Sequence, residues 1–584
     1  MGMIFHNLIK FREAEEKIWN NSVKICETER IKIGEANGRV SAEDVFSASN
    51  LPLYSRSQVD GYAVIAADLA PASRENPVAL DLSGETSIGE PAVKFPGNGK
   101  CIKVPTGGVI PIGADAMVPF EDTETHGNHI IFFKKIERFH ELSNSGIDVI
   151  KGERLIGKGS VIDPRSIAVM ASTGIGTVNV IRKIRIGIVS TGNELLYPGQ
   201  EYEEGKIYES NSISIYSELC RHPAFEVKNY GIIRDNYSEI KNAIDSSIEE
   251  NDVTITIGST SAGDHDMVYL VLGDKKPGII FHGIRVKPGK PAIFAKSGNK
   301  LIFGLPGFPV SSMMILYSLV LPALFSMAGH VFSFTEINAT SGDRIELHQG
   351  NTDLLLLKLV NRGGSYYAYQ VPGNSGSISR IGRATGFSIV CSESSYLSPH
   401  SSLIVKLFTS KIPEILFYGQ YLPATDHIPG QILDVSTFVE AGKNEIVRSM
   451  EYGDADVYFW NYRDLPDMTN YYDSVTFKIP YGVAYRHINY KTMALMYRGS
   501  GLYEYSEGIP ELNDITYLEN PEIICDYVRS GRCDAGITYK QYAELYSLEF
   551  EQKGYITFHV LINKESKRYK ELKNALASLD GANQ

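Results

Sequence analysis

The sequence predicts a multidomain α/β protein, and three observations carry that prediction. The chain has 584 residues, enough for about four domains of ordinary size. Residues 181–330 alternate apolar runs typical of buried strands with amphipathic runs typical of helices. Residues 46–140 and 331–408 carry short β-rich runs separated by Gly and Pro, which indicates two β domains.

The first 180 residues are predicted to combine helix with one of these β domains. Residues 1–45 are predicted to be helical, because Ile4, Leu8, Phe11 and Ile18 recur at amphipathic spacing. Residues 46–140 are predicted to form a small β domain. Residues 141–180 are expected to return to helix, ending at the glycine of the MASTGIG run at 170–176.

Residues 181–330 are predicted to form a parallel sheet covered by helices on both faces. Strands are expected in the runs RKIRIGIVSTG, FEVKNYGIIRD and DVTITIGSTSAGD, and helices in NSISIYSELCRH and NYSEIKNAIDSSIEE. No Lys, Arg, Asp or Glu occurs from Leu301 to Thr335. Only about 17 residues of that stretch are continuously apolar, so we expect a buried helix and no membrane segment.

The remainder is predicted to contain a β barrel or sandwich at 331–408 and a mixed α/β module at 409–584. The second module, called the tail below, holds 17 Lys and Arg against 25 Asp and Glu. It therefore accounts for most of the chain's formal charge of −12. It also holds 20 of the 34 tyrosines, which would suit a ligand cleft or reflect a drift in composition.

Composition excludes several classes of protein. Apolar residues make up 43% and charged residues 22%, values that argue against a disordered, collagen-like or membrane-embedded chain. The acidic balance argues against nucleic-acid binding. Six cysteines without a C-x-x-C pair argue against a disulfide scaffold or a structural zinc site. The N-terminus lacks a basic segment followed by an apolar core, so we expect no signal peptide and a cytoplasmic protein.

Small, hydroxyl-bearing and acidic residues follow the predicted parallel strands. The strand ends are 190–194, 234–235 and 258–266, and ligands of such sheets lie beyond these ends. Ser190–Glu194 is expected to leave a strand and enter a helix, whose first N–H groups would favour an anion. Lys287 and Lys290, held close by Pro and Gly, would add positive charge, and Glu194, Asp235 and Asp266 would suit Mg²⁺.

Each of these pieces has an ordinary structural explanation. A Ser-Thr-Gly turn is usually a plain strand–helix connection, an Asp at a strand end is usually a helix cap, and Lys-Pro-Gly-Lys is usually an exposed turn. The clustering of several such features at one end of one sheet favours a site for a phosphorylated or other anionic ligand.

The motifs together resemble those of the molybdopterin molybdenumtransferase (MoeA) family, which includes the E domain of gephyrin. The resemblance covers about residues 1–408 and rests on STGNEL at 190–195, IIRD at 232–235, the loop at 258–266, VKPGKP at 286–291 and GLPGFPVSS at 304–312. It extends to Pro52, SQVDGYAV at 57–64, GEP at 89–91, PTGG at 105–108, Pro111, GADA at 113–116, Glu121, SISR at 377–380 and GRATG at 382–386.

The resemblance implies insertion of molybdate, or tungstate, into adenylylated molybdopterin, with hydrolysis of the phosphoanhydride and release of AMP. It implies Mg²⁺ as cofactor, bound by Glu194, Asp235 and Asp266, with Asp60 and Thr106 joining these three as catalytic residues. Substrate and anion contacts would come from Asp148, Ser190, Thr191, Gly192, Ser261, Lys287, Lys290, Pro306 and Ser311.

The family resemblance also implies an architecture. The β domain at 46–140 would be inserted between the two halves of a linker domain, 1–45 and 141–180. The molybdopterin-binding domain at 181–330 would be a three-layer α/β unit, followed by the β barrel. Two copies would form an elongated homodimer, in which the β domain of one subunit meets the α/β domain of the other.

The sequence departs from the family pattern at several motif centres. Ser259 and Thr260 stand where the family has Gly-Val, Phe308 replaces an Asn, and Val59 replaces a Met. The segment before Asp148 lacks the family's usual Arg and Glu. An altered or weakened enzyme, or a non-catalytic scaffold or sensor that binds a pterin or oxyanion, therefore stays open. A pterin adenylyltransferase, which shares the α/β domain, is less favoured because it lacks the two β domains.

The tail resembles type 2 periplasmic-binding-protein-like domains, such as the substrate-binding domains of LysR-type regulators. The resemblance rests on two similar helix-turn-strand units at 449–457 and 527–537 and on YRGSG at 497–501. It implies a two-lobed α/β fold with Arg498, Ser500 and Gly501 as candidate anion contacts. The hypothesis is a tail that binds molybdate, tungstate or a pterin intermediate; the alternative is a degenerate clamp used for packing.

Overall fold

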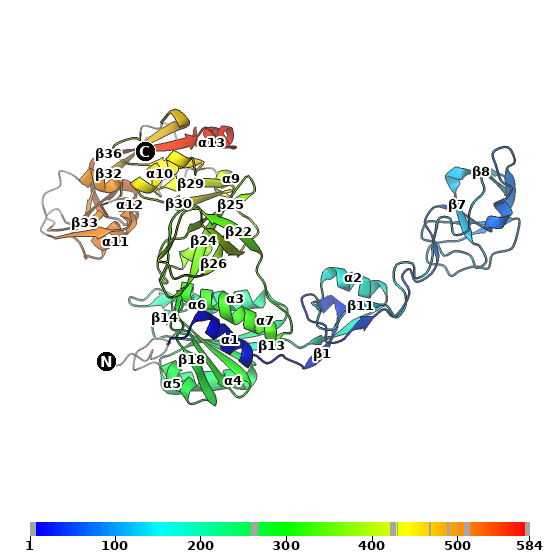
Figure 1. The fold of residues 1–584 in the computed structure, drawn as a ribbon, viewed down its shortest axis with the longest axis horizontal. Helices are drawn as coiled ribbons and strands as arrows, with labels where there is room; N and C mark the ends of the chain where they lie inside the picture. The colour runs from blue at the N-terminus through cyan, green and yellow to red at the C-terminus, as the bar shows by residue number, and fades with distance from the viewer. Residues whose placement is uncertain are drawn as a thin grey trace.

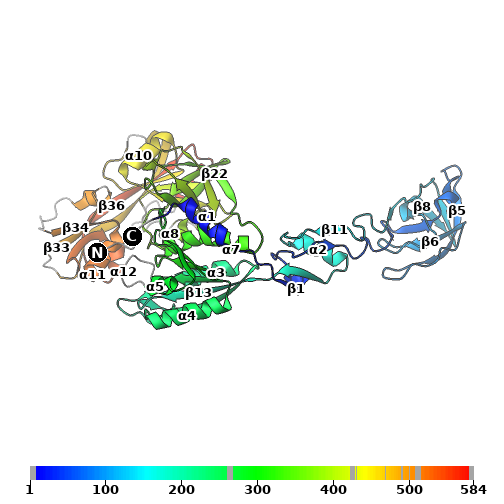
Figure 2. The same cartoon turned by 60° about the horizontal axis from the view of Figure 1, so that its bottom comes forward.

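The protein is elongated, with its inserted β domain far from the rest of the chain (Figures 1 and 2). The computed structural model describes residues 8–258, 267–420, 428, 430–466, 469–487, 491–498, 500–506 and 514–577. The β domain occupies one end and a narrow linker follows it. The α/β domain, the barrel and the tail gather at the other end.

The α/β domain contains a six-stranded sheet in the order β16-β13-β17-β21-β20-β18. The first four strands run parallel, and β20 runs antiparallel to both of its neighbours, β21 and β18. This arrangement confirms the α/β prediction. The strands span Phe225–Ile233, Ile184–Thr191, Val253–Ile257, Lys300–Leu305, Ile293–Ser297 and Pro277–His282.

Helices cover both faces of this sheet. On one face, α4 (Tyr237–Glu250) and α5 (Met267–Gly273) bury Ile240, Ile244 and Val268. On the other, α1 (Phe11–Asn21), α3 (Asn211–Cys220), α6 (Pro309–Ile315) and α7 (Leu321–Met327) pack against the isoleucines of β13 and β17. The result is the three-layer arrangement expected from the alternating pattern.

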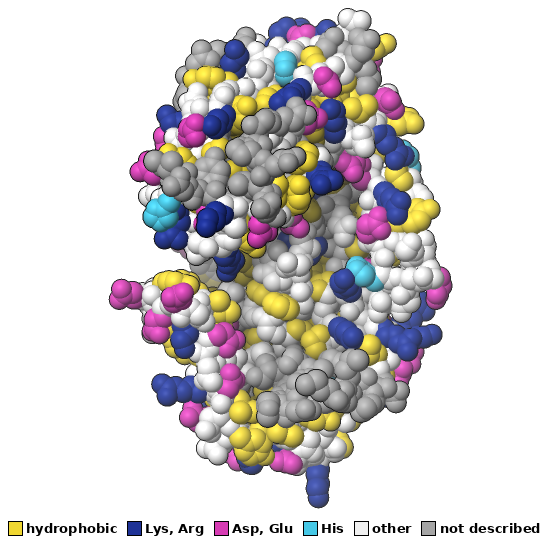
Figure 3. All heavy atoms as spheres, turned by 90° about the vertical axis from the view of Figure 1, so that its left-hand side faces the viewer, with side chains coloured by type: hydrophobic (Ala, Val, Ile, Leu, Met, Phe, Trp, Pro, Cys, Tyr) yellow, Lys and Arg dark blue, Asp and Glu magenta, His cyan; other side chains and the backbone are white. Residues whose placement is uncertain are grey.

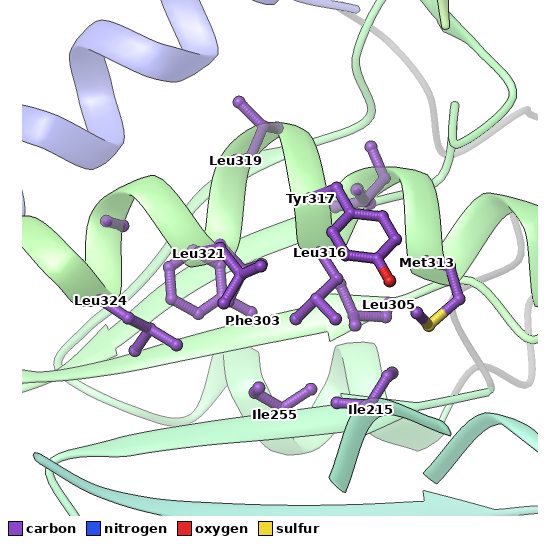
Figure 4. Close-up of a cluster of buried hydrophobic side chains, with 14 of the residues drawn as sticks. Ile215, Ile255, Phe303, Leu305, Met313, Leu316, Tyr317, Leu319, Leu321 and Leu324 are labelled. Atoms are coloured by element: carbon purple, nitrogen blue, oxygen red, sulfur yellow. The ribbon is translucent and has the colours of Figure 1, made fainter. Parts of the chain in front are cut away.

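The long apolar stretch is a core helix of this domain. The segments α6 and α7 are joined by a π-helical turn, Leu316–Val320. By length and composition the helix Pro309–Met327 could span a membrane, but 89% of its most apolar 18-residue window is buried inside the protein. Figure 4 shows Leu316, Leu321 and Leu324 directed toward the sheet residues Phe303 and Leu305. The burial of this helix in the core therefore explains why it carries no charged residue.

The linker differs from the helical prediction for 1–45 and 141–180. Each half contains one short helix within the described residues, α1 and α2 (Pro164–Ser172). Much of the remainder is strand: β1 (Thr28–Lys32) pairs with β12 (Thr177–Ile181), and β2 (Val45–Phe46) pairs with β11 (Arg154–Ile156). The first pairing joins segments about 150 residues apart and the second segments about 110 residues apart, which local spacing does not reveal. The predicted helix end at 170–176 is confirmed, with Gly174 at φ 89°.

The inserted β domain contains one six-stranded sheet in the order β7-β4-β6-β5-β9-β8. Its strands span Ala116–Pro119, Gly61–Val64, Lys100–Val104, Val78–Glu85, His129–Phe132 and Thr123–His126. Val59, one of the departures from the family pattern, packs beside the core residues Ala63 and Met117 of this domain. An apolar residue is therefore accommodated at that position.

The next domain is a closed β barrel. Five strands pair in the order β24-β25-β22-β28-β26, and β26 pairs back to β24. They span Thr352–Arg362, Ser365–Gln370, Glu336–Ser341, Ser402–Leu407 and Gly386–Cys391. A two-residue strand of the α/β domain, β19 (Val286–Lys287), adds to β24 with Lys287 opposite Asp353. The barrel thus supports the segment that carries both lysines of the VKPGKP motif.

The tail is built around one eight-stranded sheet in the order β30-β29-β31-β36-β32-β35-β33-β34. Two long antiparallel strands, β32 (Tyr472–Tyr485) and β36 (Glu549–Asn563), lie at its centre. The flanking strands span Ser436–Glu440, Ile415–Gly419, Val457–Trp460, Ala535–Tyr539, Thr492–Met496 and Asp514–Leu518. Helices α10 (Lys443–Tyr452) and α11 (Pro521–Arg529) precede β31 and β35, as the two helix-turn-strand units predict.

The tail and the barrel share one hydrophobic core. Val360 and Tyr369 of the barrel are almost fully buried in a cluster with Leu416, Tyr418 and Trp460 of the tail. Tyr418 Oη also donates to Asp343 Oδ2 at 2.8 Å. The tail is therefore docked on the barrel. Figure 3 shows that the face of the molecule is hollowed between the tail above and the α/β domain below, with Lys and Arg side chains bordering the hollow.

Candidate functional site

The carboxyl ends of the four parallel strands converge at one edge of the α/β sheet. The backbone is tightly packed there: Gly258 has φ 91°, and a Cβ at this position would lie 2.5 Å from the carbonyl oxygen of Thr191. Gly258 N donates to the Leu305 carbonyl at 3.2 Å. Glycine is thus required where the loops after β13, β17 and β21 meet. The predicted residues Ser259, Thr260, Ser261 and Asp266 lie outside the described residues.

The prediction that Ser190–Glu194 enters a helix is wrong. After β13 the chain forms the short strand β14 (Leu195–Leu196), an excursion through Pro198, Gly199 and Gly205, and β15 (Ile207–Tyr208), which pairs in parallel with β14. The following helix, α3, begins only at Asn211. Proline and two glycines interrupt the helix at its expected start, so no helix N-terminus lies at Gly192.

Asn193 and Asp235 connect the ends of β13 and β16. Asn193 N donates to Asp235 Oδ2 at 3.1 Å, and Asp235 N donates to Asn193 Oδ1 at 3.2 Å. Lys206 Nζ donates to the Asn193 carbonyl at 2.6 Å. Glu194, next in the chain, is exposed. These bonds hold the loops after β13 and β16 together, so Glu194 and Asp235 lie at neighbouring strand ends.

Ser190 and Thr191 are both buried below this surface. Ser190 Oγ donates to Glu209 Oε1 at 3.4 Å, and the Glu209 carboxylate also accepts from Ser212 N at 2.7 Å at the start of α3. Thr191 Oγ1 donates to the Ile257 carbonyl at 3.3 Å. Both hydroxyl groups thus donate a hydrogen bond within the α/β domain.

Lys287 is held by two residues that sequence reasoning missed. Lys287 Nζ lies 2.6 Å from Nε2 of His348, and Nδ1 of His348 lies 2.6 Å from Oδ1 of Asp353. The Asp353 carboxylate is buried and accepts from His348 N at 2.8 Å. Both partners belong to the barrel, about 60 residues downstream, and no motif signal marks them. Lys290, three residues after Lys287, is exposed.

The start of α6 lies against a loop of the barrel. Pro306 and Ser311 are buried, and Val310 N donates to the Ser375 carbonyl at 3.1 Å. Phe308 is 61% exposed, and its ring lies beside Gly376. The departure at Phe308 therefore places an aromatic ring at the α/β–barrel junction, next to the SISR motif.

Asp60 and Thr106 lie together, but in the distant β domain. Thr106 N donates to Asp60 Oδ1 at 2.8 Å. Asp148 is in the linker, where its backbone N–H donates to the Leu51 carbonyl at 3.0 Å. The β domain and the α/β domain stand at opposite ends of the molecule (Figure 1), so one chain does not bring these residues to Glu194 and Asp235.

The metal prediction rests on oxygen ligands alone. Glu194 and Asp235 offer the carboxylate donors that a hard cation such as Mg²⁺ prefers, and one oxygen of Asp235 already accepts from Asn193. Among the described residues no group of three His, Cys, Asp or Glu is placed to hold a metal. The third predicted ligand, Asp266, lies outside that part of the chain.

The three predicted tail contacts lie in different environments. Ser500 is fully buried, and Gly501 N donates to Gln420 Oε1 at 3.2 Å. The guanidinium of Arg498 instead stacks over the Tyr517 ring, 5.5 Å from its centroid. The hydrogen-bond network around Gln420 includes Asn461 Nδ2 at 2.9 Å, a contact that sequence reasoning also missed.

Fold and site together define a multidomain α/β protein whose glycine-rich loops and acidic strand ends meet at one sheet edge. Residues 9–174 match the family model described as "MoeA N-terminal region (domain I and II)". Residues 187–326 match the model described as "Probable molybdopterin binding domain".

Curated relatives and solved structures agree with these matches. The chain is 32% identical over 323 residues to the molybdopterin molybdenumtransferase of Haemophilus influenzae, which covers 55% of this chain and 78% of the relative. It is 32% identical over 287 residues to that of Bacillus subtilis, covering 48% and 66%. A MoeA crystal structure from Pyrococcus horikoshii superposes with a TM-score of 0.61 at 29% identity, covering 69% of this chain and all of that one.

The chain therefore belongs to the molybdopterin molybdenumtransferase family, whose enzymes act in molybdenum cofactor biosynthesis.

Proposed function

We propose that this enzyme inserts molybdate, or tungstate, into adenylylated molybdopterin in a Mg²⁺-dependent reaction that releases AMP. The observation that carries the proposal is the hydrogen-bonded pair of Asn193 and Asp235, which places Glu194 and Asp235 at adjacent strand ends of the α/β sheet. Lys287, held by His348, lies in the segment that follows β18. Anionic ligands of open α/β sheets bind at the carboxyl edge.

In the proposed reaction the positively charged and the negatively charged residues have different roles. Lys287 and Lys290 attract the phosphate groups and molybdate, all of which are anions. The exchange of hydrogen bonds between Asn193 and Asp235 holds the two strand-end loops together, so the Asp235 carboxylate is oriented before substrate binds. Glu194, Asp235 and Asp266 would hold Mg²⁺, which would polarise the phosphoanhydride for attack by water.

We further propose that the complete site forms between two copies of the chain. Asp60 and Thr106 are already paired with each other at 2.8 Å, yet they lie at the far end of the chain that carries them. A homodimer in which the β domain of one subunit reaches the sheet edge of the other would bring the two sets of residues together.

For the tail we propose a type 2 periplasmic-binding-protein-like fold. Parallel strands β29, β30 and β31 lie on one side of the central pair β32 and β36, and β33, β34 and β35 lie on the other. Two long strands crossing between two sets of parallel strands support a two-lobed arrangement. The same topology would serve the alternative of a clamp used for packing.

The test of the main proposal is AMP release. Purified protein, adenylylated molybdopterin, molybdate and Mg²⁺ should yield AMP and a metal-containing pterin. Glu194→Gln should lower the rate by about 100-fold or more, because it removes a charge at the reacting group. Binding of the adenylylated pterin without AMP release in the unmodified protein would favour the non-catalytic scaffold.

A further inference from the structure

A cavity of about 480 Å³ lies between the barrel and the tail, away from the sheet edge described above. The barrel contributes Lys358, Gln370 and Arg383, among others, and the tail contributes residues from the ends of several strands and from the start of α11. The volume suits a small organic molecule. The matched family models end at residue 326, before the residues of both walls.

The two walls are held rigidly. The barrel–tail core around Val360 and Tyr369 lies beside the cavity, and the barrel backbone at Asn361 donates to the Pro413 carbonyl at 2.8 Å. The cavity is therefore part of a packed junction, and its shape does not depend on a flexible tether. A ligand here would contact the transferase part and the tail together.

Both signs of charge face this cavity. Lys358 and Arg383 come from the barrel. The tail contributes Glu440 at the end of β30, and Glu519 and Glu522 before and within the first turn of α11. Lys358 Nζ donates to the Phe438 carbonyl, which orients the ammonium toward the tail wall. Burial, reinforced by the nearby Arg383, lowers the pKa of Lys358 to about 8. Burial raises the pKa of Glu440, while Lys358 and Arg383 lower it again, so the three groups interact electrostatically.

Much of the remaining lining is apolar or aromatic. Phe438, Met496 and Leu502 supply apolar surface, and Tyr497, Tyr539 and Tyr542 supply rings with hydroxyl groups. Gln420 is a polar residue of the cavity wall, and its side chain is held in place because Oε1 accepts from Asn461 and Gly501. The site thus has a cationic part, an anionic part and an apolar part within one cavity.

This combination disfavours a bare oxyanion. Molybdate or tungstate carries only negative charge and would lie within reach of Glu440, and it is far smaller than the cavity. A zwitterion places its carboxylate at Lys358 and Arg383 and its ammonium at Glu440, so that charges of both signs gain a partner. Its side chain would lie against the apolar lining.

We propose that the barrel–tail cavity binds an α-amino acid, with Lys358 and Arg383 holding the carboxylate and Glu440 holding the ammonium group. The site is formed by both domains, so the amino acid acts as an effector at the junction between the transferase and its tail. This proposal is independent of the chemistry at the sheet edge.

The test is titration calorimetry of the full chain with each of the twenty L-amino acids, and with sodium molybdate and sodium phosphate in parallel. At least one amino acid should bind. Its amide, which lacks the carboxylate, and its N-acetyl derivative, which lacks the ammonium, should each bind roughly tenfold more weakly or worse, the loss expected for one charge-assisted hydrogen bond.

Matched variants locate the site. Lys358→Met and Glu440→Gln should each weaken amino-acid binding by about tenfold or more. Lys287→Met, at the sheet edge, should leave it unchanged, which separates this proposal from the proposed transferase reaction. Circular dichroism of the near-isosteric Glu440→Gln chain checks that the fold is kept.

Three results would overturn the proposal. They are the absence of heat with every amino acid, competition of molybdate for the same site at equal strength, and amino-acid binding that survives both Lys358→Met and Glu440→Gln.

Discussion

Lys287 Nζ lies 2.6 Å from Nε2 of His348, so a lysine of the VKPGKP motif is held by a histidine of a different domain. The pairing of β19 with β24 places Lys287 opposite Asp353, and Asp353 in turn holds the other nitrogen of the His348 ring. With Nδ1–H donating to Asp353, Nε2 is free to accept from the ammonium group. His348 is therefore a positioning residue for Lys287.

Replacing His348 by Ala should weaken anion binding more than it slows turnover. Lys287 would keep its charge but lose its fixed position, so KM for adenylylated molybdopterin should rise by roughly tenfold while kcat changes less. Steady-state AMP release measures both constants. His348→Gln, whose side-chain oxygen can still accept from Lys287, is the matched control and should recover most of the loss. Equal effects from Ala and Gln would contradict the positioning role.

Two inactive variants should complement each other if the site spans two subunits. Asp60→Asn disables the β-domain half, and Glu194→Gln disables the sheet-edge half. In a mixed dimer one of the two sites combines an unmodified Asp60 with an unmodified Glu194, so random mixing should restore about a quarter of the unmodified activity. The assay is AMP release after the two variants are unfolded, mixed and refolded together. If each chain formed its own complete site, mixing would restore nothing.

Gly258→Ala should destabilise the sheet edge. The new Cβ would lie 2.5 Å from the Thr191 carbonyl oxygen, at a φ of 91° that side chains rarely adopt. We expect a loss of about 1–3 kcal/mol in the free energy of unfolding of this domain. Hydrogen exchange of the β13 and β17 amides measures the loss locally. Gly273→Ala is the control, since a Cβ there meets no atom within 4 Å; an equal effect at Gly273 would refute the steric argument.

The bond between Arg182 and Asp252 should make the α/β domain sensitive to acid. Arg182 Nη1 and Nη2 donate to the two Asp252 oxygens at 2.7 and 2.9 Å, and both side chains are mostly buried. Burial alone would raise the Asp252 pKa, but the hydrogen bond from Arg182 lowers it overall. A carboxylate with a lowered pKa stabilises the fold above its unfolded pKa of about 4, and the stabilisation is lost as the pH falls below that value.

Arg182→Met should therefore cost about 3–5 kcal/mol near neutral pH, because it leaves a buried carboxylate without its partner. The difference from the unmodified protein should shrink as the pH falls below about 4, where Asp252 becomes protonated. Chemical unfolding followed at several pH values measures it. Arg185→Met is the control: Arg185 Nε is 4.0 Å from Asp252 and half exposed, so its loss should matter little. A pH-independent difference would count against the mechanism.

The local sequence pattern was sufficient to predict the elements that pack against neighbours close in the chain. Strands β13, β16 and β17 and helices α3 and α4 of 181–330 follow from apolar periodicity, because each element buries one face on the next. The helix end at Gly174, the burial of the charge-free stretch after Leu301 and the helix-turn-strand units of the tail follow for the same reason. The motifs also placed Asp235 and Glu194 at adjacent strand ends.

Tertiary structure decided what depends on pairing between distant segments. The strand β1 was predicted as helix because its partner β12 lies about 150 residues away, and the chain after Gly192 turns into β14 instead of a helix. The contact between His348 and Lys287 depends on the register of β19 against β24. The barrel–tail cavity depends on the packing of Val360 and Tyr369 against the tail. Sequence periodicity records which face of an element is buried, whereas the partner that buries it is selected by the free energy of the whole packed chain.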